Sequence, residues 1–133
     1  MKLSADDALI AILIAAMDAS GHVSADEAAR AHNMIWSMRR FRNRSGEAVG
    51  RRIGRMRALV EKHGTPPVVE AAARAIPARL RRAAFAIAAD LVLVDGRMEP
   101  PEARFLRKAA GDLGLDRRTV RNTLEVIRIK NSA

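Results

Sequence analysis

The run ALIAILIAAM at residues 8–17 decides the fold class, because it is apolar on nearly every side of the helix that it would form. A helix without a polar face is typically enclosed by other helices. A second run of this kind, AAFAIAADLVLV, follows at residues 83–94. Strand signals are almost absent, since β-branched residues are sparse and alanine is abundant. The sequence therefore predicts an all-α fold with two buried central helices.

Helix start and stop signals on either side of these runs predict about seven helices in one compact domain spanning residues 1–133. The segment RRFRNRSG at residues 39–46 is polar and basic, and we expect it to connect two helices. No connection is long enough to divide the domain. The expected helices cover residues 4–19, 24–38, 46–62, 67–75, 77–94 and 100–113, and a last one begins after the cap residue Asp116.

The composition excludes several classes of site. The chain has no cysteine, so disulfides, zinc–thiolate centres and thiol nucleophiles are ruled out. A net charge of +9 is compatible with nucleic acid, anionic lipid or an acidic protein as partner. Asp6 and Asp7 precede the first apolar run, where a signal peptide would be positively charged. That run is also shorter than the about 20 residues of a membrane span, so we expect no transmembrane segment.

A repeated unit relates the ends of the two apolar runs. The first run ends in Ser20-Gly21, and Val23–Ala28 opens the next helix. The second run ends in Asp95-Gly96, and Met98–Ala103 opens the next helix. The same offset of 75 residues relates Ser20 to Asp95 and the glutamate of the first copy to that of the second. The chain is therefore expected to contain an internal pseudo-repeat.

Each position of the repeat has a mechanical reason. We expect Gly21 and Gly96 to end their helices in the left-handed conformation, which a side chain would disfavour. Glu27 and Glu102 stand three residues inside the following helices, where a glutamate reaches back to unpaired backbone N–H groups. The repeat thus predicts two glycine-stopped, glutamate-capped helix junctions.

This doubled pattern of apolar helix, Asp/Ser-Gly, apolar residue, short spacer and glutamate resembles the two motifs of the TerB family of tellurite-resistance proteins. The resemblance extends from about Leu9 to Ile127. It implies a compact bundle of about seven helices that associates with partner proteins of tellurite or chemical-stress resistance, some of them membrane-associated. It also implies a metal-binding role for acidic motif residues. The first copy departs from the family by carrying Ser20 where aspartate is usual.

The acidic residues beside the second glycine have two interpretations. As oxygen ligands they would form a weak Ca²⁺ or Mg²⁺ site; as capping groups they would stabilise the turn and the next helix. Asp90 lies about 140° around its helix from Asp95, so the two need not converge, and we expect an arginine or a capping N–H beside Asp90. Capping is the favoured interpretation. The candidate residues are Asp90, Asp95, Glu99 and Glu102, with Glu27 as the counterpart in the first copy.

An arginine-rich middle segment suggests the main alternative function, a basic nucleic-acid-binding helical module. Trp36 and Phe41 are the nearby aromatic residues. Aromatic residues for base stacking are scarce, however, and no recognition helix is evident. A solvated helix face, or a surface for an acidic protein or lipid headgroups, also explains the charge. The arginines are Arg39, Arg40, Arg42, Arg44, Arg51, Arg52 and Arg55.

Catalytic motifs are missing from the sequence. It contains no Gly-x-Ser-x-Gly, no glycine-rich phosphate loop and no His-Glu-x-x-His. His22, His32 and His63 include no pair at the i, i+4 spacing of a helical metal site. We therefore expect a non-enzymatic interaction module in the cytoplasm, or at the inner face of the membrane.

Overall fold

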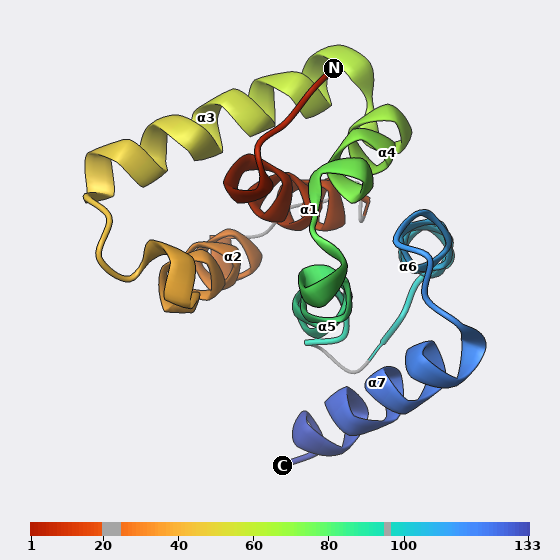
Figure 1. Cartoon of the computed structure of the whole chain (residues 1–133). Coiled ribbons are helices and arrows are strands. Elements are labelled where there is room, and N and C mark those ends of the chain that lie inside the picture. Colours follow the sequence, from red (N-terminus) through yellow and green to blue (C-terminus); the bar gives the residue numbers. More distant parts are fainter. Residues whose placement is uncertain (20–24, 95–96) are drawn as a thin grey trace.

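The computed structural model describes residues 1–19, 25–94 and 97–133. In these ranges the chain forms seven α-helices, two short 3₁₀ helices and no strand (Figure 1), which confirms the predicted all-α fold. The elements are α1 (Ala5–Ala19), α2 (Ala25–Ser37), η1 (Arg39–Phe41), α3 (Gly46–His63), α4 (Thr65–Ala75), η2 (Ala78–Leu80), α5 (Arg81–Val92), α6 (Pro100–Asp112) and α7 (Arg117–Lys130).

The helix boundaries follow from local hydrogen bonding. The Ser4 hydroxyl accepts a 3.1 Å hydrogen bond from the backbone N–H of Asp7, which starts α1 where the sequence predicted. Asp116 caps α7 in the same way, since its carboxylate accepts a 2.7 Å bond from the N–H of Thr119. Between α3 and α4, Gly64 has a φ of 80°, a left-handed conformation that suits glycine. These signals place the helices close to their predicted positions.

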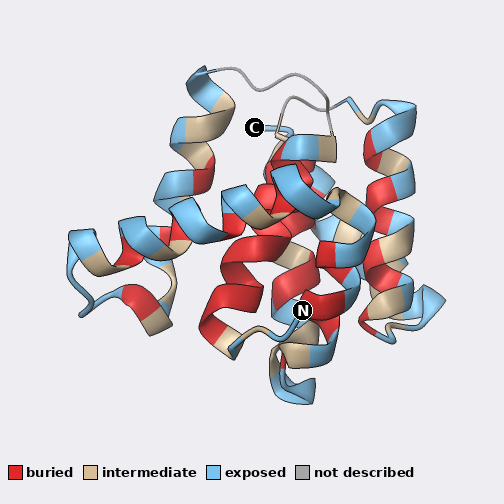
Figure 2. Ribbon diagram, turned by 90° about the horizontal axis from the view of Figure 1, so that it is seen from above, coloured by how far each residue is buried: buried red, intermediate tan, exposed pale blue. Residues whose placement is uncertain are grey.

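Helix α1 is the centre of the molecule. It is buried without interruption from Asp6 to Met17 (Figure 2), as the apolar run predicted. Its main neighbours are α3, α4 and α5, and α2 and α6 also pack against it. The predicted enclosure of residues 8–17 is therefore confirmed.

Helix α5 packs beside α1 but differs from the prediction in two ways. It begins at Arg81, because residues after Pro77 first form the tight turn η2, in which the N–H of Leu80 bonds to the Pro77 carbonyl at 2.9 Å. One face of α5 is also only half buried, at Ala86, Ile87 and Asp90. The second apolar run thus makes one side of the core rather than an enclosed helix.

The basic segment after α2 contains a core residue. Phe41, at the end of η1, has an exposed fraction of 0%. Residues 39–46 therefore connect α2 to α3, as expected, but they also supply a side chain to the core. The turn η1 directs this ring inward while its arginines remain at the surface.

The outermost helices are α3 and α7, which lie on opposite sides of the central pair α1 and α5 (Figure 1). Helix α3 buries Val49, Ile53, Met56 and Val60, which recur at helical spacing on one face. Helix α7 packs chiefly against α5 and buries Ile127. Within the described part of the chain, no helix has the length and apolar character needed to cross a bilayer.

Candidate interaction site

A groove of about 440 Å³ lies between α2, α5 and α6. It is bordered by the first turns of α2 and α6 and by the C-terminal end of α5. One wall is apolar and the other charged. The lining residues are Asp26, Glu27, Arg30, Leu91, Val92, Val94 and Glu102.

The groove brings together the glutamates of the two repeat copies. Glu27 comes from the first turn of α2 and Glu102 from the first turn of α6. The sequence had paired these residues only by their common offset. Asp26 adds another carboxylate to the same groove. The pseudo-repeat therefore has a spatial counterpart, in which acidic groups from both copies face one apolar wall.

Glu102 has the capping role that the sequence predicted. Its Oε1 atom accepts a 2.9 Å hydrogen bond from the backbone N–H of Glu99, just before α6 begins. The residue is only 9% exposed. Pro100 and Pro101 occupy the first helical positions, where a missing N–H is tolerated. The position of Glu102 in the groove is thus fixed by the backbone that it caps.

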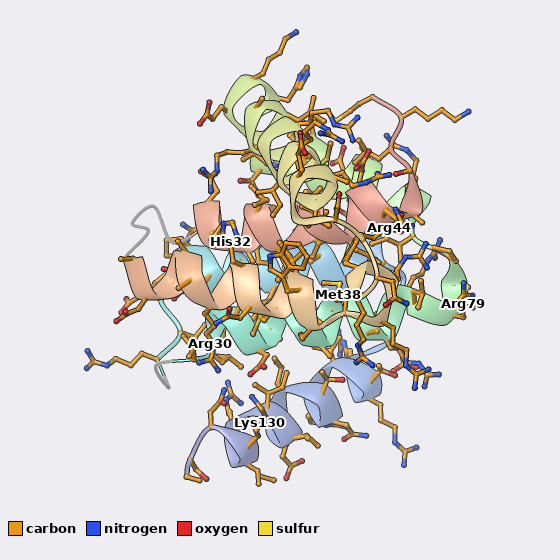
Figure 3. The ribbon with its side chains drawn as sticks, turned by 90° about the vertical axis from the view of Figure 1, so that its left-hand side faces the viewer. Arg30, His32, Met38, Arg44, Arg79 and Lys130 are labelled. Carbon is orange, nitrogen blue, oxygen red and sulfur yellow. The ribbon has the colours of Figure 1, made fainter. Side chains whose placement is uncertain are left out.

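Among the residues that the structure describes, Arg30 is the one cation that lines the groove. It lies on the side of α2 that turns away from α3 (Figure 3). Its Nε atom is buried and has no hydrogen-bond acceptor among the residues that the structure describes. An unsatisfied buried donor is unfavourable by about 1–3 kcal/mol. A ligand that supplied an acceptor at this point would remove that penalty.

Asp90 lies apart from the groove, at the contact between α5 and α7. Both of its carboxylate oxygens accept 3.0 Å hydrogen bonds from Lys130 Nζ, and Asn131 donates to the same carboxylate at 3.3 Å. Figure 3 shows Lys130 on the side of α7 that faces the rest of the molecule. A cation beside Asp90 was expected, but it is a lysine from α7 rather than an arginine.

Several predicted motif residues lie outside the described residues, namely Asp95, Gly21 and Gly96. Of the other candidate metal ligands, Glu99 is exposed and Asp90 is held by Lys130. In residues 1–19, 25–94 and 97–133, no three Asp, Glu or His side chains gather closely enough to hold a metal ion. A Ca²⁺ ion takes six to eight oxygen ligands, so the described carboxylates do not fit such a site.

Titration of the chain with Ca²⁺ or Mg²⁺ is therefore expected to give no saturable heat. The physical reason is that Glu102 caps α6 and Asp90 is paired with Lys130, which leaves too few oxygen ligands among the described residues. Isothermal calorimetry measures this directly. Saturable binding that disappears in the variant Asp95→Ala would contradict the expectation and would assign an ion to the second glycine junction.

Two carboxylates at the start of α1 bind arginines of the basic segment. Arg40 Nε donates to Asp6 Oδ1 at 2.7 Å, and an Arg44 guanidinium nitrogen donates to Asp6 Oδ2 at 3.0 Å. The Asp6 side chain is only 12% exposed. The first half of the predicted basic surface is therefore partly neutralised from within the fold.

The second half has the same arrangement around Asp7. Arg52 bonds to Asp7 Oδ1 at 2.8 Å, and Arg55 approaches the same oxygen at 3.4 Å. Both arginines come from α3, so the network joins α1 to α3. A carboxylate in the first turn of a helix is also favoured by the helix dipole. We refer to Asp6, Asp7, Arg40, Arg44, Arg52 and Arg55 as the α1 ion-pair network.

The other arginines of the predicted basic surface are differently placed. Arg51 forms an exposed pair with Glu47 at 3.2 Å. Arg39 and Arg42 make no ion pair with any described residue, and both are exposed. Asp6 and Asp7 also carry one negative charge each against two arginines. The basic surface is therefore weaker than the sequence suggested, but it keeps a net positive charge.

The arginines lower the pKa of Asp6. Burial alone would raise that pKa, but the hydrogen bond from Arg40 and the positive charges of Arg40, Arg44 and Arg52 outweigh it. Because the folded-state pKa lies below the unfolded one, the ionised carboxylate stabilises the fold at pH values above about 4. This contribution is lost as the pH falls through the folded-state pKa.

The free energy of unfolding of the native chain is accordingly expected to fall more steeply below about pH 4 than that of the variant Asp6→Asn. The amide of the variant takes up no proton, so the variant lacks the contribution of the Asp6 carboxylate to the pH dependence of the free energy of unfolding. Urea unfolding followed by circular dichroism at a series of pH values measures both slopes. Equal slopes would contradict the role assigned to Asp6.

The sequence analysis did not recognise Asp6 and Asp7 as partners of the arginines. The available signal was a pair of acids directly before an all-apolar helix, in a chain with an excess of arginine. Buried carboxylates require hydrogen-bonded or charged partners, so the pair indicated that positively charged side chains lie close to it. It did not indicate which arginines these are.

Comparison with known families gives an independent result. The family described as Tellurite resistance protein TerB matches residues 6–124. This match covers most of the 133 residues and includes both repeat copies. The chain therefore belongs to the TerB family, as the doubled motif predicted. Neither the curated proteins nor the solved structures gave a match.

Proposed function

We propose that this chain is a non-enzymatic interaction module of a tellurite or chemical-stress resistance system. In this proposal it acts in the cytoplasm, or at the inner face of the membrane where a membrane-associated resistance protein is its partner. The groove between α2, α5 and α6 receives that partner. One observation carries the proposal, which is that both copies of the family motif supply a glutamate to this groove.

The chemistry of the groove suits a protein segment. Leu91, Val92 and Val94 provide an apolar wall, and Asp26 lies at the exposed edge. A partner segment that combines apolar and basic side chains would match both features, since opposite charges across an interface favour association. Arg30 Nε, which has no acceptor among the described residues, would donate to a backbone carbonyl of that segment. These groups support recognition rather than bond-making chemistry.

The alternative of a nucleic-acid-binding module is less well supported. Arg40, Arg44, Arg52 and Arg55 bind carboxylates of α1, so their charge is partly compensated before a phosphate could approach. Phe41 is fully buried and unable to stack on a base. Gel shifts at low salt with duplex and single-stranded probes address this alternative, because phosphate contacts are strongest under those conditions.

A complementation assay tests the proposed function. Deletion of the gene is expected to increase sensitivity to tellurite, and the native chain should restore resistance. The variant Asp26→Lys reverses a charge at the edge of the groove and should fail to restore it. Removal of this first-turn acid weakens the helix by only about 0.3–1 kcal/mol, so the variant should remain folded.

The matched control is Glu61→Lys, which makes the same charge change at an exposed position of α3 away from this groove. It should complement fully. A photo-crosslinking residue at Val94 should also give a discrete protein adduct in cells, whereas the same residue at position 61 should give none. Full complementation by Asp26→Lys, or no adduct at Val94, would contradict the proposal.

A further inference from the structure

A second groove, of about 450 Å³, lies between α6 and α7. It is distinct from the groove between α2, α5 and α6, with which it shares no lining residue. Its floor is apolar, because α7 packs chiefly against α5 and leaves its contact with α6 incomplete. The floor residues are Ala110, Gly111, Leu115, Val120 and Leu124.

Arginines border this groove on both sides. Arg107 lies on α6, and Arg117, Arg121 and Arg128 lie on α7. The spacing of four and then seven residues keeps the three α7 arginines on one helix face. All four side chains are exposed, and none forms an ion pair with another residue in the described ranges.

Two acidic residues next to the groove already have partners. Asp112 pairs with Lys108 at 3.2 Å, and Lys108 also bonds to Glu70 of α4 at 2.8 Å. Asp116 accepts the capping hydrogen bond of α7 from Thr119. Glu125 of α7 is exposed and does not line the groove. The four arginines at the rim therefore leave an excess of positive charge around an apolar floor.

We propose that this groove binds an amphipathic helix of a partner protein whose polar edges are acidic. Its apolar stripe would cover Val120, Leu124 and the open space above Gly111, as in other helix-in-groove complexes. Its Asp and Glu side chains would meet the arginines, whose planar guanidinium groups suit paired hydrogen bonds to carboxylates. The combination of an apolar floor and a basic rim selects this occupant.

Other occupants match fewer of these features. A second copy of this chain also carries a net charge of +9, so the two copies would repel each other. Nucleic acid would use the arginines but not the apolar floor, which contains no aromatic ring for base stacking. A membrane surface would instead contact Val126 and Ile129, the most exposed large hydrophobic residues of α7, which do not line the groove.

The test uses a synthetic peptide of about 15 residues, or about four helical turns, with leucines on one helical face and glutamates elsewhere. Fluorescence anisotropy measures its binding to the full chain. A scrambled peptide of the same composition, which has no apolar face, is expected to bind at least about tenfold more weakly, since it cannot cover the floor.

Two variants of the chain examine the floor and the rim separately. Gly111→Leu places a side chain in the groove, because Gly111 lines it. A Cβ atom added at this exposed helical position would have no neighbouring atom within 4 Å, so the substitution should cause no clash. Gly54→Leu is its control, since Gly54 is equally open on α3. We expect Gly111→Leu to weaken peptide binding about tenfold and Gly54→Leu to leave it unchanged. Leucine favours helix more than glycine does, so both variants should fold.

The double variant Arg117→Glu/Arg121→Glu reverses the charge of the rim and should weaken binding by about tenfold or more. Its control is Arg39→Glu/Arg79→Glu, at two exposed arginines that do not line the groove. Equal binding of the scrambled peptide, or native affinity in Gly111→Leu, would overturn the proposal. The proposal would also be overturned if anionic lipid vesicles or duplex DNA displaced the peptide equally well from the native chain and from Gly111→Leu.

This proposal and the function proposed above fail separately. The variant Asp26→Lys changes only the groove of α2, α5 and α6, so it should bind the acidic peptide normally. Loss of complementation in Asp26→Lys, together with absent peptide binding to the native chain, would leave the proposed function standing and refute only the α6–α7 site.

Discussion

Replacing Phe41 with alanine is expected to lower the free energy of unfolding by about 3–5 kcal/mol. The ring has an exposed fraction of 0% and belongs to the continuous hydrophobic core. Its removal deletes a large buried apolar surface and leaves a cavity that the surrounding helices fill only in part. Chemical denaturation followed by circular dichroism measures the loss.

The control for this experiment is Ile129→Ala on α7. The Ile129 side chain is 64% exposed, so its truncation should change the free energy of unfolding by no more than about 0.5 kcal/mol. If Phe41→Ala were as stable as this control, Phe41 would be a surface residue. Its ring would then be accessible for stacking on a nucleic-acid base.

The double variant Asp6→Asn/Asp7→Asn removes both carboxylates of the α1 ion-pair network. It is expected to lower the free energy of unfolding by about 2–4 kcal/mol at neutral pH. The change preserves side-chain size but leaves Arg40 and Arg52 without the anions that they contact at 2.7 and 2.8 Å. The cost stays below that of a fully buried pair, because these arginines are 31% and 27% exposed and can gain water.

The exposed pair Arg51–Glu47 offers a control on the same helix α3. Both side chains are at least 66% exposed, and pairs of this kind contribute about 0–1 kcal/mol. The variant Glu47→Gln should therefore unfold at nearly the native denaturant concentration. A double variant that was as stable as this control would show that the network carries charge compensation without stabilising the fold.

The central helix and the caps could be predicted because they depend on neighbouring residues. An uninterrupted apolar run at residues 8–17 admits no solvent-facing side, and the structure buries it completely. Ser4 and Asp116 cap residues only three positions away. The stripe on α3 follows from helical periodicity alone. Such features require no knowledge of how the helices are arranged.

The contacts of Asp6 and Asp7 could not be predicted because they join residues 34 to 48 positions apart. They depend on how η1, the turn after it and α3 lie against α1, which periodicity does not specify. Phe41 was missed for a different reason. A single aromatic residue within a polar, basic segment produces no periodic signal, and the short turn η1 determines that it points inward.

The candidate site was predicted in part. The common offset identified Glu27 and Glu102 as equivalent, but it did not show that they line one groove. The groove between α6 and α7 could not be predicted either, since Val120 and Leu124 recur at the helical spacing that is typical of a buried face. Both are only partly buried, because α6 does not close over α7. An amphipathic pattern indicates which face is apolar but not how completely a neighbour covers it.

The position of α1 has a consequence for synthesis on the ribosome. The helix is translated before its principal neighbours α3, α4 and α5, which extend to Val92. Its apolar residues therefore stay exposed until the ribosome has passed the end of α5. Nascent chains with such surface are prone to aggregate and attract chaperones. The apolar run that forms the centre of the folded protein therefore makes the partly synthesised chain prone to aggregation until its neighbouring helices have been translated.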